Sequence, residues 1–379
     1  MWIVPSVLYW SSLGLVVYTY VGYPALISAL ARLRPRRIRS SSIEPTVSVV
    51  LAVHNEETNI GRKLDNLLGL DYPADKLQVV VVSDASTDGT DALVAEYRER
   101  HPGRVVLVQL ESKSGKAVAI NRGMERARGE VVVFCDARQQ IDGQALRALV
   151  PPFADPSVGA VSGELEIAGE RGPSFYWRYE KLIRAAEGMV DSVVGATGAL
   201  FAIRRHLFQQ LPPGTLLDDV YTPMQIVLQG YRVLFEPGAR VYDQEAQLSG
   251  EFARKARTLA GNFQLVELLP QLLNPFKNRL FTQFVSHKLL RLVCPFALAT
   301  LLASNVVLVA TGAPGWPLYV LTLAGQMTAY GLALKGAIEG ERAGRPARIS
   351  HTFVVLNLAA VEGLRRFVGR ELQWTTARP

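Results

Sequence analysis

Between residues 46 and 135, uninterrupted apolar runs alternate with segments whose apolar residues recur at helical spacing. Short runs rich in β-branched residues are typical of buried strands, whereas apolar residues three or four positions apart are typical of amphipathic helices. The sequence therefore predicts four strands and three helices, with strands at 46–53, 77–83, 104–109 and 130–135 and helices at 57–70, 87–100 and 115–127. This alternation predicts an α/β fold with a mostly parallel sheet and flanking helices.

Two long segments, 1–31 and 292–334, contain no charged residue. A helix that crosses a bilayer needs about 20 apolar residues. The first segment is long enough for one such helix, and the second allows two, broken by the Gly- and Pro-rich turn at 311–317. A cleaved signal peptide is the alternative for the first segment, but no basic stretch precedes it and its apolar run is too long. We therefore expect an N-terminal transmembrane helix at 1–31 and two more at 289–338.

The rest of the chain divides by composition. We expect a basic cytoplasmic linker at 32–44, a cytosolic domain at 45–250, and interfacial amphipathic helices at 251–288. A helix that simply packs on the domain is the alternative for this last segment. Residues 339–379 are expected to hold a cytoplasmic loop, a short apolar helix and a tail. That helix either lies in the membrane plane or forms a fourth span.

Basic residues cluster beside the expected spans, and the net charge is +7. Because cytoplasmic flanks of membrane helices carry the excess of Lys and Arg, the catalytic domain is expected in the cytoplasm of a multi-pass protein in a bacterial-type inner or plasma membrane. The same charge attracts anionic membrane lipid. We expect no nucleic-acid partner, because basic and aromatic residues do not interleave on one element. The two cysteines match neither a metal site nor a disulfide framework.

Polar clusters follow three of the predicted strands, at 54–57, 84–89 and 136–138. Any one of them is typical of a helix cap, and for Thr87 and Asp88 the cap interpretation is favoured. Because ligands bind beyond the carboxyl ends of parallel strands, the three clusters together indicate a ligand site.

Two further patterns suggest chemistry at this edge. Asp136 follows a wholly apolar strand, and the basic loop 113–116 opens a helix, so the two suit a divalent cation and phosphate groups. The spacing of a Walker loop is absent, and a solvated basic loop is the alternative. Asp218 and Asp219 open another helix, where they are either favourable first-turn charges or a general base.

The chain resembles the membrane-bound family 2 glycosyltransferases, the group that includes the cellulose, chitin and hyaluronan synthases. The resemblance covers about residues 45–275. Seven motifs carry it in order, namely V-H-N-E-E, D-A-S-T-D-G-T, K-S-G-K-A-V-A-I-N-R-G, F-C-D-A-R, G-A-T-G-A-L-F-A-I-R-R, L-D-D-V and R-K-A-R.

This resemblance implies a GT-A fold, a UDP-sugar donor, a Mg²⁺ or Mn²⁺ ion, and inversion at the anomeric carbon. By position in the motifs, it implies Asp219 as the base, Asp218 beside it in place of a glutamate, and Arg257 at the leaving diphosphate. Asp136 is implied as the metal ligand. The residues implied to contact the donor are Ala52, His54, Glu56, Asp84, Lys116, Asp136 and Arg254.

The chain departs from the family pattern at two places. Arg138 replaces the second aspartate of the D-x-D motif, and a guanidinium cannot ligate a metal, although it can contact phosphate. The Q-x-x-R-W motif appears as residues 254–258 without its Gln and Trp, which leaves processive synthesis and single-sugar transfer both open. The expected acceptor is a glycan or a lipid-linked molecule. A catalytically weak, membrane-anchored nucleotide-binding subunit is the alternative, motivated by Arg138.

Overall fold

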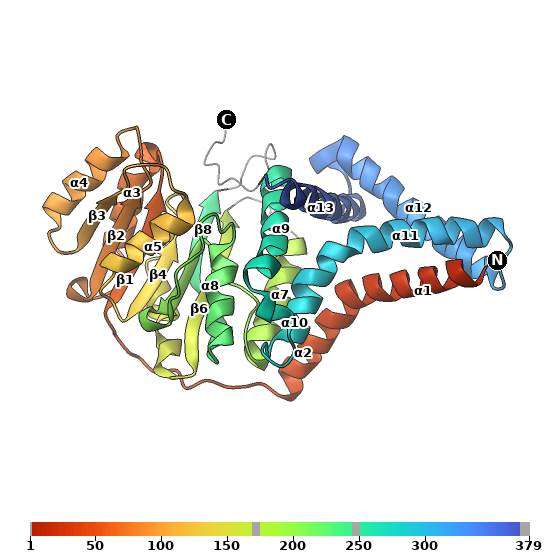
Figure 1. Cartoon of the computed structure of the whole chain (residues 1–379), viewed down its shortest axis with the longest axis horizontal. Coiled ribbons are helices and arrows are strands. Elements are labelled where there is room, and N and C mark those ends of the chain that lie inside the picture. Colours follow the sequence, from red (N-terminus) through yellow and green to blue (C-terminus); the bar gives the residue numbers. More distant parts are fainter. Residues whose placement is uncertain (1, 169–174, 245–250, 372–379) are drawn as a thin grey trace.

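The structure is a computed structural model that describes residues 2–168, 175–244 and 251–371. An eight-stranded sheet forms the centre of the larger lobe (Figure 1), with the strand order β3-β2-β1-β4-β7-β6-β8-β5. The strands are β1 (Val47–Val53), β2 (Leu77–Ser83), β3 (Val105–Gln109), β4 (Val131–Cys135), β5 (Gln140–Ile141), β6 (Val158–Ala168), β7 (Leu200–Arg204) and β8 (Arg232–Gln244). Four of the seven described pairings are parallel, which confirms the α/β prediction.

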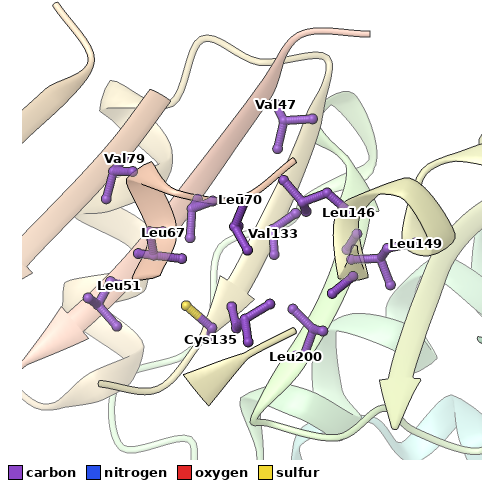
Figure 2. Packing of buried hydrophobic residues seen from close by; sticks show 14 of the residues in the cluster. Val47, Leu51, Leu67, Leu70, Val79, Val133, Cys135, Leu146, Leu149 and Leu200 are labelled. Carbon is purple, nitrogen blue, oxygen red and sulfur yellow. The ribbon is translucent and has the colours of Figure 1, made fainter. Parts of the chain in front are cut away.

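The first half of the sheet follows the sequence pattern closely. β1 is parallel to β2 and β4, and β2 to β3, so the polar clusters that follow β1, β2 and β4 lie at one edge. Alternate residues of a strand face opposite sides of the sheet. Leu51 therefore packs in a core cluster with α3 (Glu57–Leu68), whereas Val50 packs in another with α5 (Lys116–Arg126). Figure 2 shows the first cluster, in which Leu67 of α3 lies over Leu51 and Val79. α4 (Thr90–Arg100) precedes β3.

The second half of the sheet is mixed. β7 pairs antiparallel with both β4 and β6, and the short β5 pairs antiparallel with β8. The apolar pattern of the sequence predicts no strand after residue 135, so β5 to β8 are seen only in the structure. Three helices belong to this half, namely α6 (Ala145–Leu149), α7 (Phe175–Val190) and α8 (Asp218–Leu228). α8 begins at Asp218, which places both aspartates in its first turn.

Two of the described helical stretches are long and apolar enough to cross a membrane, by length and composition. Ile3–Leu33 consists of α1 (Ile3–Val17), a π-helical segment and α2 (Tyr23–Leu33). Phe281–Ala310 consists of α10 (Phe281–Phe284), the π-helical segment η6 (Val285–Leu289) and α11 (Leu290–Ala310). The third expected helix forms as α12 (Trp316–Glu339), but it is not among these two candidates. Membrane crossing and its direction stay predictions.

The apolar helices pack together and extend away from the sheet (Figure 1). Tyr9 of α1 joins a buried cluster with Leu301, Leu308 and Tyr319, and its hydroxyl donates to Thr322 Oγ1 at 2.8 Å. This arrangement leaves α2 and the start of the second stretch next to the sheet domain, where α2 packs against α7 through Ile27 and Ile183.

The segment after the sheet domain forms α9 (Glu251–Leu268), which packs against both the domain and the C-terminal helix α13 (Arg345–Val368). Gly261 lies against Leu217, and Phe263 stacks on Phe367 with ring centroids 5.8 Å apart. Figure 1 shows α13 close to end-on while α11 lies along the page, so α13 crosses α11. The described part of α9 thus has a packing role, and its contact with a bilayer surface stays a prediction.

Gly363 tests this contact between α13 and α9. A Cβ at Gly363 would lie 2.9 Å from Ala260 N and 3.0 Å from Ala256 O, both backbone atoms. We expect Gly363→Ala to lower stability by about 1–3 kcal/mol, because backbone cannot yield as a side chain does. The measurement is the midpoint of thermal unfolding of the purified protein in detergent.

The matched control is Gly331→Ala in α12, where a Cβ would meet no atom within 4 Å. Because alanine favours a helix over glycine by about 0.5–1 kcal/mol, this variant should unfold at the same or a higher temperature. Equal midpoints for the two variants would contradict the close packing of α13 on α9.

Candidate active site

The loops after β1 and β2 are held against each other in uncommon backbone conformations. His54 Nδ1 lies 2.7 Å from the carbonyl oxygen of Asp84. Asn55 and Ala85 follow these two residues, and both have a φ of 53°. A positive φ is uncommon for residues other than glycine, and such strain gathers at binding sites. The strained backbone of these two loops therefore shapes the sheet edge at which the donor is predicted to bind.

Asp84 fixes the basic loop before α5. Its carboxylate is 1% exposed, and it accepts hydrogen bonds from the backbone amides of Ser114 at 2.6 Å and Gly115 at 2.8 Å. Gly115 has a φ of 90°, a conformation that glycine adopts without strain. These contacts position Lys116 at the first residue of α5. The direct contact of Asp84 with a nucleotide stays a prediction.

Asp88 has a structural role at the same edge. Its Oδ1 accepts from the backbone amide of Thr90 at 3.0 Å, and its Oδ2 accepts from that of Glu57 at 3.1 Å. The side chain thus ties the start of α4 to the start of α3, in line with the structural interpretation of the sequence. Glu56 donates its backbone amide to Thr90 Oγ1 at 2.9 Å, and Ala52 is half-buried in β1.

Lys116 joins two carboxylates that are far apart in the sequence. Its Nζ lies 3.1 Å from Asp136 Oδ1 and 3.3 Å from Asp218 Oδ2. Burial lowers the pKa of this ammonium, but the charges of Asp136, Asp218 and Asp219 outweigh that effect and raise the pKa well above its ordinary value. Lys116 therefore stays charged, and it neutralises the acidic cluster at this edge of the sheet.

Asp219 lies beside this cluster, without an ion pair among the described residues. Burial raises the pKa of its carboxyl to about 6, the negative charge of Asp218 adds to the rise, and Lys116 and Lys288 oppose it. The turn at 195–198 holds Asp219 in place, because Ala196 donates its amide to the Asp219 carbonyl oxygen at 2.7 Å. A Cβ at Gly198 would lie 3.1 Å from Asp219 Oδ2, so the glycine admits the carboxylate. A half-buried carboxylate with such a pKa can accept a proton near neutral pH.

Arg254 and Arg257 lie on α9, shortly after residues outside the described ranges. Arg254 is exposed and Arg257 is half-buried. Within the described ranges, no hydrogen bond or ion pair connects either guanidinium to Lys116 or the aspartates. The structure therefore brings Lys116, Asp136, Asp218 and Asp219 together, whereas the roles of the two arginines stay predictions.

The carboxylate oxygens of Asp136 suit a metal ion only together with oxygen ligands from a bound substrate. The described residues contain no group of three His, Cys, Asp or Glu side chains that could hold an ion. The Asp136 side chain is 38% exposed, and magnesium binds through one or two carboxylates plus phosphate oxygens and water. Arg138 lines a small cavity with Arg62 and Lys63 of α3 and adds no ligand. Asp136 together with the diphosphate of a nucleotide sugar therefore supplies suitable oxygen ligands for a divalent ion, whereas the described protein residues alone do not.

Three further polar residues near Asp219 are absent from the sequence-based candidates. Ser162 Oγ of β6 accepts hydrogen bonds from the Thr197 amide at 3.0 Å and from Arg184 Nη2 at 2.6 Å. The negative charge of Asp219 acts on two cations, Arg184 of α7 and Lys288 of η6. No motif marks them, because they come from elements that only tertiary packing brings to this site.

Comparison with known proteins agrees with this geometry. Residues 48–212 match the family described as Glycosyl transferase family 2. Over 161 residues the chain is 32% identical to a β-monoglucosyldiacylglycerol synthase of Synechocystis sp., covering 42% of this chain and 33% of that protein. Over 250 residues it is 24% identical to a poly-β-1,6-N-acetyl-D-glucosamine synthase of Staphylococcus aureus, covering 63% and 59%. The chain thus spans from a third to about three-fifths of these curated relatives.

A solved structure is similar over nearly the whole chain. It is a mannosyltransferase from Pyrobaculum calidifontis in complex with GDP-mannose and Mn²⁺, with a TM-score of 0.75 and 26% sequence identity. The match covers 96% of this chain and 99% of that one, so it includes the apolar helices as well as the sheet. The fold is the GT-A-like fold that the motifs imply, and residues 48–212 form a glycosyl transferase family 2 domain.

Proposed function

We propose that this protein is a membrane-bound glycosyltransferase that transfers a sugar from a nucleoside diphosphate donor to an acceptor hydroxyl, with inversion at the anomeric carbon. The observation that carries the proposal is Asp219, a carboxylate with a pKa of about 6 beside the Lys116–Asp136 pair. A base and a phosphate-binding cation at one sheet edge are what a single displacement at the anomeric carbon requires.

In this proposal Asp219 takes the proton of the acceptor hydroxyl as the oxygen attacks the anomeric carbon. The bond from that carbon to the diphosphate oxygen breaks, and the nucleoside diphosphate leaves with an added negative charge. Lys116 lies where an ammonium can stabilise this charge, and Arg257 is a further candidate for the same task. A divalent ion at Asp136 would bind the diphosphate oxygens and neutralise part of their charge.

Two donor classes are proposed. The motif resemblance favours a UDP-sugar, whereas the mannosyltransferase of similar structure was solved with GDP-mannose. Neither the loop at Asp84 nor the loop at His54 contains a sequence pattern that selects uracil or guanine as the nucleobase of the donor. A screen of UDP-glucose, UDP-N-acetylglucosamine, UDP-galactose and GDP-mannose, read as nucleoside diphosphate release by the purified protein, decides between them. Release from none of these donors would favour the alternative of a catalytically weak subunit.

The acceptor side is proposed to lie at the membrane. The apolar stretches Ile3–Leu33 and Phe281–Ala310 support anchoring, and the basic flank at 32–39 supports a cytoplasmic catalytic domain. The curated relatives include one named for a glycolipid product and one named for a polysaccharide product. Sizing the product by mass spectrometry separates single-sugar transfer from chain extension.

The first prediction concerns the proposed base. Asp219→Asn should lower kcat by about 10²–10⁴-fold, because an amide cannot accept the hydroxyl proton, and should leave the Kd for the donor unchanged. Turnover assays and donor titrations measure the two quantities. Asp75→Asn, at an exposed carboxylate of the short helix before β2, is the matched control and should behave as wild type. Wild-type turnover in the Asp219 variant would remove it from this role.

The second prediction concerns pH. The carboxyl of Asp219 acts as a base only when ionised, and its pKa is raised to about 6, so kcat should be constant above that pH and fall below it. At pH 5 the rate should be about tenfold below the plateau, since a group with that pKa is then about nine-tenths protonated. Asp218→Asn removes a negative charge that contributes to the rise, so its acidic limb should move to lower pH. A limb that is unmoved in this variant would contradict the electrostatic coupling of the two carboxylates.

The third prediction concerns the metal. Excess EDTA should abolish turnover, and Mn²⁺ or Mg²⁺ should restore it, because Asp136 and the diphosphate form a suitable donor set. Asp136→Asn should raise the Mn²⁺ concentration for half-maximal turnover by at least about tenfold. Full turnover in excess EDTA would show that Lys116 alone suffices as the cation at this place.

A further inference from the structure

Charged side chains are buried where α7 meets the start of the apolar stretch Phe281–Ala310. His287 is 4% exposed, and its Nδ1 lies 2.8 Å from Glu187 Oε1 while its Nε2 lies 3.1 Å from Glu180 Oε2. Arg291 pairs with Glu180, and the Tyr23 hydroxyl donates to Glu187. Both glutamates of α7 are therefore partnered by groups from the apolar helices.

Two cations at the same junction have no such partner. Arg184 lies on α7 one turn from each glutamate, and its described contacts are with neutral groups: a hydrogen bond to Ser162 Oγ at 2.6 Å and a cation–π contact with the Phe235 ring at 4.9 Å. Lys288 follows His287, and within the described residues it makes no hydrogen bond or ion pair. The negative charges that act on both cations are those of Glu180, Glu187 and Asp219. Glu164 also acts on Arg184 but pairs with Lys181, and the two glutamates of α7 are already partnered. Among the described residues, Asp219 is therefore the carboxylate without an ion pair that acts on both cations.

Hydrogen bonds through the Ser162 side chain and the backbone of residues 196–197 connect Arg184 to Asp219. Ser162 Oγ accepts from Arg184 and from the Thr197 amide, and the preceding residue, Ala196, donates to the Asp219 carbonyl oxygen. Lys116 reaches the acidic cluster from α5, on the donor side, whereas Arg184 and Lys288 reach it from α7 and from the apolar stretch. The second pair of cations is therefore on the side from which a membrane-held acceptor would arrive.

An unpaired cation close to an apolar helix is costly unless an anion accompanies it. Asp219 cannot serve as a permanent partner, because the proposed reaction requires it to take a proton. We propose that Arg184 and Lys288 bind the phosphate of an anionic membrane lipid whose headgroup carries the acceptor hydroxyl. This inference rests on the proposed function and names its acceptor: the headgroup oxygen bonds to the anomeric carbon, its proton goes to Asp219, and the nucleoside diphosphate leaves.

The test compares two lipids that differ by the phosphate. Binding of dioctanoyl phosphatidylglycerol and of uncharged dioctanoylglycerol to the full-length protein in detergent is measured by isothermal titration calorimetry. We expect wild type to bind the phosphate lipid at least about tenfold more tightly, because hydrogen bonds to a charged group are the strong ones. Lys288→Met and Arg184→Met should each remove most of this preference and leave the affinity for dioctanoylglycerol unchanged, and Lys288→Arg should retain it.

Lys277→Met is the matched control, since Lys277 is exposed in the loop before α10, and it should keep the wild-type preference. Donor titration of each variant verifies folding. Equal affinity of wild type for the two lipids, or a preference that persists in Lys288→Met, would overturn the inference. Inorganic phosphate that binds as tightly as phosphatidylglycerol would overturn the assignment to a lipid.

The same preparations are assayed for nucleoside diphosphate release, which keeps the two proposals separate. Release without a phosphate preference contradicts only the lipid site. Lys288-dependent lipid binding without release from any donor contradicts only the proposed transfer.

Discussion

The ion pairs of Lys116 with Asp136 and Asp218 bring the site together, at 3.1 and 3.3 Å. Asp136 directly follows β4, Asp218 opens α8, and Lys116 opens α5, so three elements meet at these two contacts. Carboxylates that converge in a partly buried place repel one another, and a nearby cation makes such an arrangement stable. Asp84 fixes the loop that supplies this cation, through two backbone amides. The donor edge of the sheet therefore depends on where Lys116 is held.

Asp218 and Asp219 are adjacent in the chain, but their surroundings differ. Asp218 is 5% exposed and paired with Lys116, whereas Asp219 has no ion pair among the described residues and lies against the glycine turn at 195–198. When two neighbouring carboxyl groups lie in such different surroundings, they can take different tasks in the same site. One carboxylate contributes to the charge balance, and the other is available for a proton. The cations Arg184 and Lys288 then extend the site toward the apolar helices.

The sequence predicts the first half of this fold well because its signal is local. β1, β2 and β4 are short runs dominated by valine and other apolar residues, and the polar clusters after them mark the edge where ligands are expected to bind. β8 escapes prediction because Pro237 and Gly238 lie inside it, and β5 has only two residues. The motif order identifies Lys116, Asp136, Asp218 and Asp219, and the structure brings these four together. The motif order cannot reveal Ser162, Arg184 or Lys288, because their positions depend on how α7 and the apolar stretch pack on the sheet.

The central claim is that an acceptor hydroxyl, deprotonated by Asp219, displaces the diphosphate in one step. The anomeric configuration of the first-formed product tests it most directly. With an α-linked donor such as UDP-glucose or GDP-mannose, a single displacement inverts the anomeric carbon. The account predicts a β-linked product in the NMR spectrum of the initial reaction mixture. An α-linked product would contradict it, because retention requires a second step that the arrangement around Asp219 does not provide.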